Sequence, residues 1–336
     1  MIENINSILE SFQEQFKDHR ESVFEVDAVI ATDNRVILKG KLLEEQMVQA
    51  LQAAIYGIHP AASVDISGLT VLLKKDNKRL AVNTNLTGLY AGPSFQHEQL
   101  SQLLFGMQVE ILETKDEWVF VRQLDGYLGW MYFPYLSETT LPSPSHIVID
   151  PVVLIHETAD FGAPILTRVF AGTPMMLAKK KTDWSLVQTN VTGWVSSRSI
   201  RAIEDIPQTI AERQRMLEQD ARAFIGSPYL WGGCSTNGFD CSGFTQLVYR
   251  MSGIPIRRDA DMQFMDGKEI EASFESGELL FFGEKKDVHE IITHVGISLG
   301  DWSMIHASRA RNGVCIENIL AVPHLRDSFL FGCTYF

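Results

Sequence analysis

The chain has 336 residues, of which 45% are hydrophobic and 21% are charged, and its formal net charge is −13. A chain of this length is too long for one ordinary core, so we expect several domains. The acidic balance argues against nucleic acid or an anionic membrane surface as a partner, and the sequence has no run of about 18 apolar residues that would predict a membrane span.

The N-terminal segment opens with an acidic residue and has no basic region ahead of its apolar residues. These apolar residues recur at helical spacing between Ile5 and Phe16, which predicts an amphipathic helix and not a signal peptide. The cysteines form no CxxC pair, which favours reduced thiols; they are Cys234, Cys241, Cys315 and Cys333. We therefore expect a cytoplasmic protein, or an exported one if the true start lies upstream.

Residues 1–80 are predicted to form a small α/β unit. Strand-like runs cover 23–32 and 35–43 around a turn at Asp33-Asn34, a helix covers 44–57, and another strand covers 65–75. No residue pattern in this unit indicates chemistry, so its role stays open.

An internal repeat follows this unit. Leu89, Gly106 and Trp118 of the first copy recur 66 residues later as Ile155, Gly172 and Trp184, and Gly129-Trp130 recurs 64 residues later as Gly193-Trp194. Each copy contains several short β-rich runs separated by turn residues, a pattern typical of a small barrel. Both copies, residues 81–140 and 146–205, resemble the bacterial SH3-like domains that accompany cell-wall hydrolases. A polar, proline-bearing linker at 137–146 separates them.

Residues 207–336 contain the candidate catalytic residues. Cys241 stands at the predicted start of a helix that Gly253 ends, where unpaired backbone N–H groups and the helix dipole favour a thiolate. His294 and His306 lie on two strand-like runs joined by a tight turn at Gly300-Asp301. Neighbouring antiparallel strands bring side chains to within about 5 Å, so one histidine is expected to orient the other while His294 faces Cys241.

Three segments together make the C-terminal region recognisable: PYLWGGCSTNGFDCSGFTQ, THVGISLG and IHAS. They resemble the NlpC-type cell-wall cysteine peptidases, a circularly permuted, papain-like superfamily. With two SH3-like copies ahead of it, the region is similar to the γ-D-glutamyl-L-diamino acid endopeptidases. The resemblance implies a multidomain α+β protein that consists of the α/β unit, two SH3-like β-barrels and a papain-like peptidase domain.

The resemblance also implies roles for individual residues. Cys241 matches the nucleophile, His294 the general base and His306 the residue that orients the base. Tyr229 matches the tyrosine on the oxyanion side, and Trp231 matches a wall of the substrate groove. Neither a cofactor nor a metal is implied.

Further residues match those that hold the substrate in this group. Asp240 and Ser242 flank the nucleophile, and Asp259 and Ala260 belong to the loop that contacts the peptide. Where this chain has Ala260 the family often has serine, which removes one hydrogen bond. In the first SH3-like domain, Tyr127 is implied to meet the free amine of the substrate's L-Ala with help from an acidic residue, for which we nominate Glu98; the second copy has Val191 in place of the tyrosine.

The implied activity is cleavage of the γ-D-glutamyl–diamino acid bond in murein peptides with a free N-terminal L-Ala, as cell-wall peptide recycling requires. The alternatives are a lytic endopeptidase on intact peptidoglycan, an amidase or acyltransferase of the same superfamily, and a non-catalytic wall-binding protein. The oligomeric state and the preference for diaminopimelate or lysine stay open. The C-terminal region has four arginines near the candidate site residues, and we expect most of them to be exposed to solvent. They are Arg257, Arg258, Arg309 and Arg311.

Overall fold

The computed structural model describes residues 2–31, 34–138, 143–286 and 290–336. The chain divides into two compact units, residues 1–79 with 109–130, and residues 80–108 with 131–336. The predicted turn residue Asp33 and the middle of the predicted linker, 139–142, lie outside the described residues.

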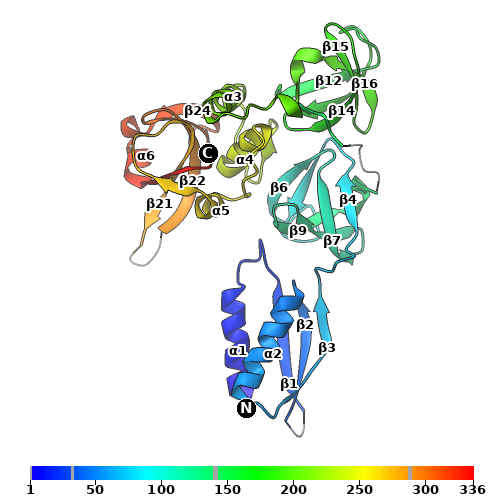
Figure 1. Ribbon diagram of the computed structural model, residues 1–336, viewed down its shortest axis with the longest axis vertical. Coiled ribbons are helices and arrows are strands. Elements are labelled where there is room, and N and C mark those ends of the chain that lie inside the picture. The colour runs from blue at the N-terminus through cyan, green and yellow to red at the C-terminus, as the bar shows by residue number, and fades with distance from the viewer. Residues whose placement is uncertain (1, 32–33, 139–142, 287–289) are drawn as a thin grey trace. The chain divides into compact units, whose positions relative to one another are not determined.

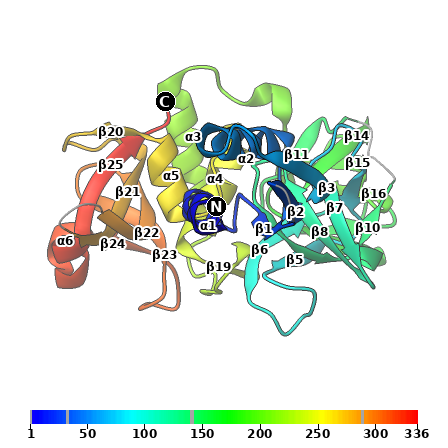
Figure 2. The same ribbon diagram turned by 90° about the horizontal axis from the view of Figure 1, so that it is seen from below.

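The N-terminal part has the predicted α/β arrangement. Strands β1 and β2 are antiparallel, and α2 makes the crossover that lets β3 pair in parallel with β2. Helices α1 and α2 pack side by side on one face of this sheet (Figures 1 and 2). Their apolar stripes, which include Ile5, Leu51 and Ile55, are buried against Val36 and Leu38 of β2. The elements are α1 (Ile2–Gln15), β1 (Phe24–Ile30), β2 (Arg35–Leu42), α2 (Glu45–Ile58) and β3 (Ser63–Val71).

The repeat in the sequence corresponds to a repeat of strands. The first copy has β4 (Arg79–Val82), β5 (Leu86–Tyr90), β6 (Gln99–Leu104), β7 (Gln108–Lys115), β8 (Trp118–Gln123), β9 (Leu128–Tyr132) and β10 (Leu136–Ser137). The second has β11 (His146–Val148), β12 (Val152–His156), β13 (Ile165–Phe170), β14 (Pro174–Lys180), β15 (Trp184–Gln188), β16 (Thr192–Ser196) and β17 (Ile200–Ala202). Its strands follow one another in the sheet in the order β13-β12-β16-β15-β14-β11-β17.

The landmarks of the repeat occupy matching places. Gly106 and Gly172 both have positive φ, at 79° and 80°. The two-residue difference in spacing lies in one turn: Gln123 N–H donates to the carbonyl of Tyr127 across three residues, whereas Thr189 N–H donates to Val191 across one. Tyr127 therefore follows a turn that is longer in the first copy.

The C-terminal domain is a sheet with helices on both faces. The sheet order is β20-β25-β21-β22-β23-β24, and helices α3, α4 and α5 lie along one face (Figure 2). Helix α6 packs on β21 from the other side, where Leu325 joins Phe282 and Met304 in a separate apolar cluster. The sequence predicts a helix at the start of this domain, the helix α4 and the three strands β21–β23, all of which are present, but not the other elements of the domain.

The elements of this domain follow in chain order. They are α3 (Ile210–Arg222), β18 (Cys234–Ser235), β19 (Gly238–Phe239), α4 (Cys241–Met251), α5 (Ala260–Asp266), β20 (Lys268–Ile270), β21 (Ser276–Lys285), β22 (Glu290–Leu299), β23 (Ser303–Ser308), β24 (Gly313–Asn318), α6 (Pro323–Ser328) and β25 (Phe329–Thr334). Single 3₁₀ turns lie at Phe133–Tyr135, Ser197–Ser199, Ile203–Asp205 and Ile319–Ala321.

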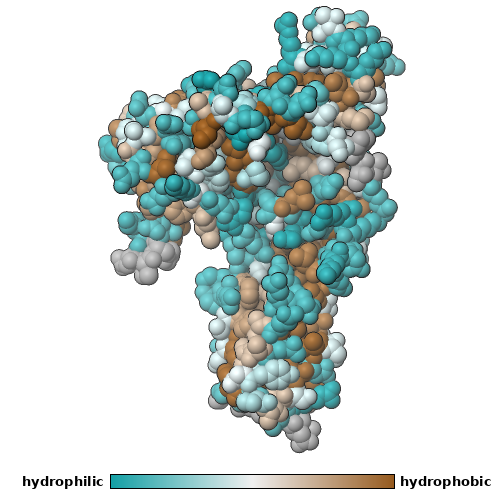
Figure 3. Space-filling model, viewed as in Figure 1, coloured by the Kyte–Doolittle hydropathy of each residue, from teal (hydrophilic) through white to brown (hydrophobic). Residues whose placement is uncertain are grey.

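The surface of the C-terminal domain that Figure 3 shows is mostly polar, with apolar side chains scattered among the polar ones. Within the described part of the chain, no helix combines the length and the apolar character needed to cross a membrane.

Candidate active site

Cys241 is the first residue of α4, as the sequence predicts. Asp240 caps this helix, since its Oδ1 accepts a hydrogen bond of 2.7 Å from the backbone N–H of Gly243. The apolar side of α4 explains its position, because Phe244, Leu247 and Val248 are fully buried in the main core of the domain. The cap and the buried face together fix where the Cys241 thiol lies.

The thiol lies beside strand β22. Helix α4 packs on this strand, and the backbone N–H of Val295, the residue after His294, lies near enough to the Cys241 thiol to act on its pKa. The packing brings together two residues that are 54 positions apart in the sequence, the candidate nucleophile Cys241 and Val295, the neighbour of the candidate base.

The two predicted histidines are in contact. His294 Nε2 lies 2.7 Å from Nδ1 of His306, and the two rings meet edge to face. His306 is 1% exposed, and the ring of His294 packs on Phe282. Since Nε2 of His294 faces His306, the nitrogen that His294 has left for a proton from a thiol is Nδ1.

Burial sets the protonation of the thiol and the base. Burial, with help from the Asp240 carboxylate, raises the pKa of the Cys241 thiol to about 12, although the N–H groups of Val295 and Ser242 act in the opposite direction. Burial and the neighbouring His306 lower the pKa of His294 to about 3. A resting thiolate favoured by the helix entrance is therefore not what the structure supports: the thiol and the imidazole are both neutral near pH 7.

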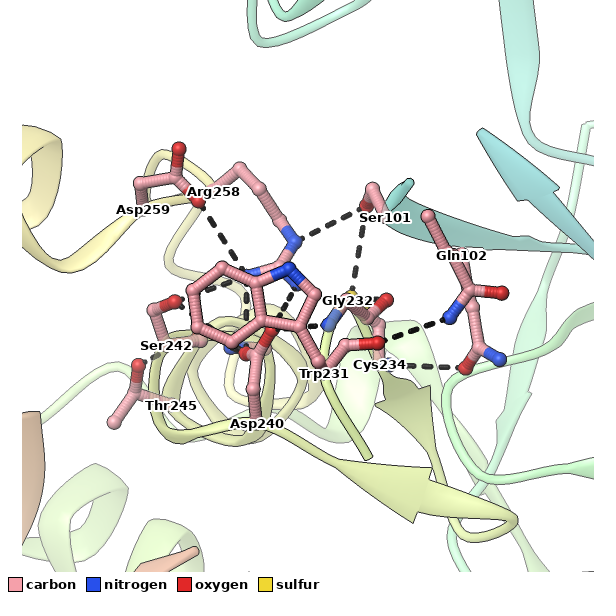
Figure 4. Close-up of polar contacts among 12 residues, drawn as sticks. Ser101, Gln102, Trp231, Gly232, Cys234, Asp240, Ser242, Thr245, Arg258 and Asp259 are labelled. Carbon is pink, nitrogen blue, oxygen red and sulfur yellow. Dashed lines mark hydrogen bonds and ion pairs between the residues drawn. The ribbon is translucent and has the colours of Figure 1, made fainter. Parts of the chain in front are cut away.

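Asp240 is held by partners within the protein. Its two oxygens accept hydrogen bonds from the backbone N–H groups of Gly243 and Gly232 and from both terminal nitrogens of Arg258, at 2.5–3.1 Å (Figure 4). These bonds use the roughly four lone-pair sites of a carboxylate, and Asp240 is 6% exposed. Asp240 is therefore engaged by partners within the protein, and its predicted contact with the substrate stays a prediction.

Arg258 is the buried member of the set of four arginines, most of which were expected to be exposed to solvent. Its side chain is 1% exposed, and its guanidinium bridges Asp240, the hydroxyl of Ser242 and the hydroxyl of Ser101. A guanidinium matches a carboxylate in a two-pronged geometry, which makes arginine the suitable cation for a buried pair. Arg258 thus ties the entrance of α4 to strand β6.

Strand β6 of the first SH3-like copy holds the loop that precedes the nucleophile. Gln102 Oε1 accepts hydrogen bonds from the backbone N–H of Cys234 at 3.0 Å and from the Ser235 hydroxyl at 2.9 Å. The Ser101 hydroxyl lies 3.6 Å from the Cys234 sulfur (Figure 4). These contacts, which sequence reasoning missed, join residues about 130 positions apart.

Trp231 and Glu98 are in contact with each other. The Trp231 ring is 59% exposed, as suits a groove wall, and its indole N–H donates to Glu98 Oε1 at 2.7 Å. Gln99 adds a bond of 3.3 Å to the Trp231 carbonyl. Glu98 therefore fixes an exposed aromatic surface; its predicted contact with the substrate amine stays a prediction.

The remaining candidates lie on both sides of Arg258. Ser242 is buried, and its hydroxyl accepts from Arg258 at 2.9 Å. Asp259 lies just before α5, with its carboxylate 3.7 Å from the Arg258 guanidinium and about a quarter of its side chain exposed. Ala260 begins α5 and is buried. Asp259 is thus more accessible than Asp240 to a positively charged group of a substrate.

Tyr229 lies in the loop before β18, half-buried against the core near Cys241. Burial and the nearby Cys241 and Asp240 raise the pKa of its hydroxyl to about 12. The hydroxyl therefore keeps its proton near pH 7 and is able to donate it to a developing oxyanion.

Tyr127 precedes β9 in the other compact unit. It is 3% exposed, and its backbone N–H donates to Asp125 Oδ1 at 3.1 Å. Its predicted role toward the substrate stays a prediction.

One group of metal-ligating side chains occurs among the described residues. It consists of His306, Cys315 and Glu317, whose candidate ligand atoms lie within 4.8 Å of one another. Glu317 is also paired with Arg311, at 2.8 Å.

Comparisons with known proteins match the C-terminal domain and the first SH3-like copy separately. The NlpC/P60 family matches residues 226–324, and the bacterial dipeptidyl-peptidase SH3 domain matches residues 89–132. The chain is 32% identical over 231 residues to a γ-D-glutamyl-L-lysine dipeptidyl-peptidase of Bacillus subtilis, with 64% of this chain and 74% of that protein covered. The chain belongs to the NlpC/P60 family. It is therefore a cysteine peptidase. The role of Cys241 as its nucleophile stays a prediction.

Two further similarities agree with this membership. A γ-D-glutamyl-L-lysine dipeptidyl-peptidase of Bacillus cereus is 29% identical over 236 residues, which cover 64% of this chain and 68% of that protein. A crystal structure of an NlpC/P60 family protein from Bacillus cereus superimposes with a TM-score of 0.67 at 23% identity, covering 77% of this chain and 99% of that one. The structural likeness supports the fold that the sequence implied.

Proposed function

We propose that this NlpC/P60 peptidase hydrolyses the bond between γ-D-glutamate and the diamino acid of murein peptides and releases L-Ala-D-Glu. The observation that carries the proposal is the arrangement around Cys241: a thiol at a helix start, held beside the strand that carries His294, with His306 bonded behind that base. The relatives named γ-D-glutamyl-L-lysine dipeptidyl-peptidase supply the substrate class.

The resting charges suggest how the reaction starts. Because the thiol and the imidazole are both neutral, attack and proton transfer go together: Cys241 sulfur bonds to the γ-carbonyl carbon while its proton moves to Nδ1 of His294. The carbonyl oxygen becomes an oxyanion, which the Tyr229 hydroxyl and the Cys241 backbone N–H stabilise by about 3 kcal/mol per donor.

The second half of the reaction uses the same base. The C–N bond breaks as His294 gives its proton to the amine of the diamino acid, and a thioester remains on Cys241. Water then attacks the thioester, His294 takes the water proton, and L-Ala-D-Glu leaves as the thiol is restored.

The free amine of the substrate is the finer part of the proposal. Asp259 is partly exposed beside Arg258, and Glu98 stands next to Trp231, so both acidic side chains lie near the loop that carries the groove wall. These two carboxylates would bind the L-Ala ammonium and restrict cleavage to peptides already released from the wall. Such a restriction suits peptide recycling in the cytoplasm.

Mass spectrometry of three substrates tests the proposal. They are L-Ala-γ-D-Glu-meso-diaminopimelate, its lysine counterpart, and the first peptide with its amine acetylated, each with Cys241→Ala as the blank. We expect L-Ala-D-Glu from the free peptides only. Equal cleavage of the acetylated peptide, together with solubilisation of intact peptidoglycan, would favour a lytic endopeptidase, and cleavage of none would favour a wall-binding protein.

A further inference from the structure

A buried carboxylate stands behind the two histidines. Glu317 Oε2 lies 3.0 Å from Nε2 of His306, on the side of the ring away from His294. The side chain of Glu317 is 7% exposed, and its other oxygen accepts hydrogen bonds from Arg311 at 2.8 and 2.9 Å. Neither Glu317 nor Arg311 had been given a function from the sequence.

The register of the strands explains how His294, His306 and Glu317 come to lie in one row. His306 of β23 pairs with Cys315 of β24, so Glu317, two residues further, points to the same face of the sheet. Gly296 of β22 makes room for the row, because a Cβ at that position would lie 3.0 Å from the Cβ of His306. His294, His306 and Glu317 thus lie in line across three neighbouring strands.

The hydrogen bonds along this line admit one arrangement of protons. An ionised carboxylate only accepts, so His306 must donate its Nε2–H to Glu317. Its Nδ1 then carries no proton and accepts the Nε2–H of His294. His294 is left with a bare Nδ1, which is the form that a general base needs.

The charges around the row keep Glu317 ionised. Burial would raise its pKa, but the hydrogen bonds from Arg311 and His306 outweigh burial and hold the pKa of Glu317 below its usual value. The other titratable groups close to His306 and Glu317 are Cys315 and His324. Burial lowers the pKa of His306 in spite of the nearby Glu317. Glu317 is thus ionised near pH 7 and acts there as a hydrogen-bond acceptor.

We propose that Glu317 is a positioning residue: it sets the tautomer of His306 and, through it, that of His294, and it offsets the positive charge that His294 gains from Cys241. The catalytic half of this inference rests on the proposed function, whereas the tautomer half does not. A carboxylate that only stabilised the fold would change neither kcat nor the protonation of the histidine rings, whereas the positioning role predicts an effect on both.

The test compares Glu317→Gln with wild type and with Glu278→Gln. Glu278 is a matched control, since it is a buried glutamate of the same domain whose Oε2 accepts a backbone N–H at 2.7 Å. The carboxamide keeps the shape of Glu317 but removes the charge and presents a donor as well as an acceptor. We expect kcat to fall by about 100-fold or more with little change in KM, as expected when the group that orients a catalytic histidine loses its charge.

Nitrogen-15 NMR of the histidine rings gives a readout without substrate. Wild type is expected to show Nε2–H tautomers for His294 and His306 at neutral pH, and Glu317→Gln to show a mixture, while Glu278→Gln stays like wild type. Unchanged tautomers in Glu317→Gln, or a kcat no lower than that of Glu278→Gln, would overturn the inference. If wild type shows the expected tautomers and Glu317→Gln loses them, but wild type cleaves no murein peptide, the proposed function is wrong. The inference that Glu317 sets the two tautomers is then still supported.

Discussion

The two SH3-like copies share a framework but not their edge strands. In the first copy, β6 carries the polar residues that hold the loop 231–235: Gln99, Ser101 and Gln102. At the matching positions, 66 residues on, β13 of the second copy has Ile165, Thr167 and Arg168. Ile165 is 56% exposed, and Thr167 bonds to Asn85 of the first copy and not to the peptidase loop.

The second copy contacts the peptidase domain through apolar packing and an ion pair. Phe170 and Ala171 join the main core of the peptidase domain, and Arg201 forms a partly buried pair with Asp220 at 2.6 Å. The comparison teaches that a duplicated barrel became part of an active site through the side chains of one strand. The barrel framework, with its paired glycines and tryptophans, did not change.

A close backbone approach makes the β6 contact specific. Gly232 has a φ of +71°, and a Cβ at this position would lie 2.3 Å from the carbonyl oxygen of Gln99. Only glycine tolerates both conditions, so the loop is seated directly on the strand. Small changes on β6 are therefore expected to reach the catalytic residues.

The largest expected effect comes from the residue that links β6 to α4. Arg258→Met leaves Asp240 buried without its cation, which should cost about 3–5 kcal/mol of unfolding free energy and abolish activity. Arg257→Met is the matched control, because Arg257 pairs with the more exposed Asp266 and should cost about 1 kcal/mol or less. Urea unfolding of both variants measures the difference, and equal losses would refute the bridging role of Arg258.

Acid should weaken the peptidase domain through His294, which is partly buried. The pKa of His294 is lowered from 6.5 to about 3, so below pH 6.5 the unfolded chain binds a proton that the folded chain refuses. The unfolding free energy therefore decreases as the pH is lowered, by about 3 kcal/mol from pH 6.5 to about pH 4. In His294→Gln this part of the pH dependence should disappear from the unfolding free energies, and an unchanged slope would contradict a neutral His294.

The matched pair Gln102→Ala and Arg168→Ala tests the difference between the two copies directly. Gln102→Ala leaves the N–H of Cys234 and the hydroxyl of Ser235 without their acceptor, at a cost of about 1–3 kcal/mol. We expect kcat/KM for the free peptide to fall about tenfold, while Arg168→Ala stays close to wild type. Similar losses in both variants would mean that the two copies serve the site equally.

The smallest expected effect distinguishes two roles for Glu98. Glu98→Gln keeps an oxygen that accepts the Trp231 indole N–H but removes the charge. If Glu98 acts only by holding Trp231, KM should change less than twofold, whereas Glu98→Ala should raise KM several-fold. A large rise in KM for Glu98→Gln itself would instead indicate that the carboxylate pairs with the substrate ammonium.

Sequence reasoning located the residues whose surroundings are local. Cys241 could be placed at a helix start because Asp240 and the apolar period of α4 are its neighbours in the chain. His294 and His306 could be paired because one tight turn joins their strands, and the bond of 2.7 Å between their rings agrees with that pairing. The repeat likewise showed itself through its fixed spacing.

Contacts between distant segments could not be predicted in this way. Arginine is usually exposed, so nothing in the sequence marked Arg258 as buried, and only the packing of β6 against the loop reveals why it is. Glu317 lay on a strand that was not predicted, so its place behind His306 depends on a register that only the structure gives. The resting charge of Cys241 was misjudged because burial outweighs the helix dipole.

The central claim is that Cys241 is acylated by the dipeptide part of the substrate. The most direct measurement is acid quenching during turnover of L-Ala-γ-D-Glu-meso-diaminopimelate, followed by peptide mapping by mass spectrometry. The account predicts an L-Ala-D-Glu thioester on Cys241 that disappears once the substrate is consumed. Turnover without such an adduct, or an adduct on Cys234 or Cys315 in its place, would contradict the account.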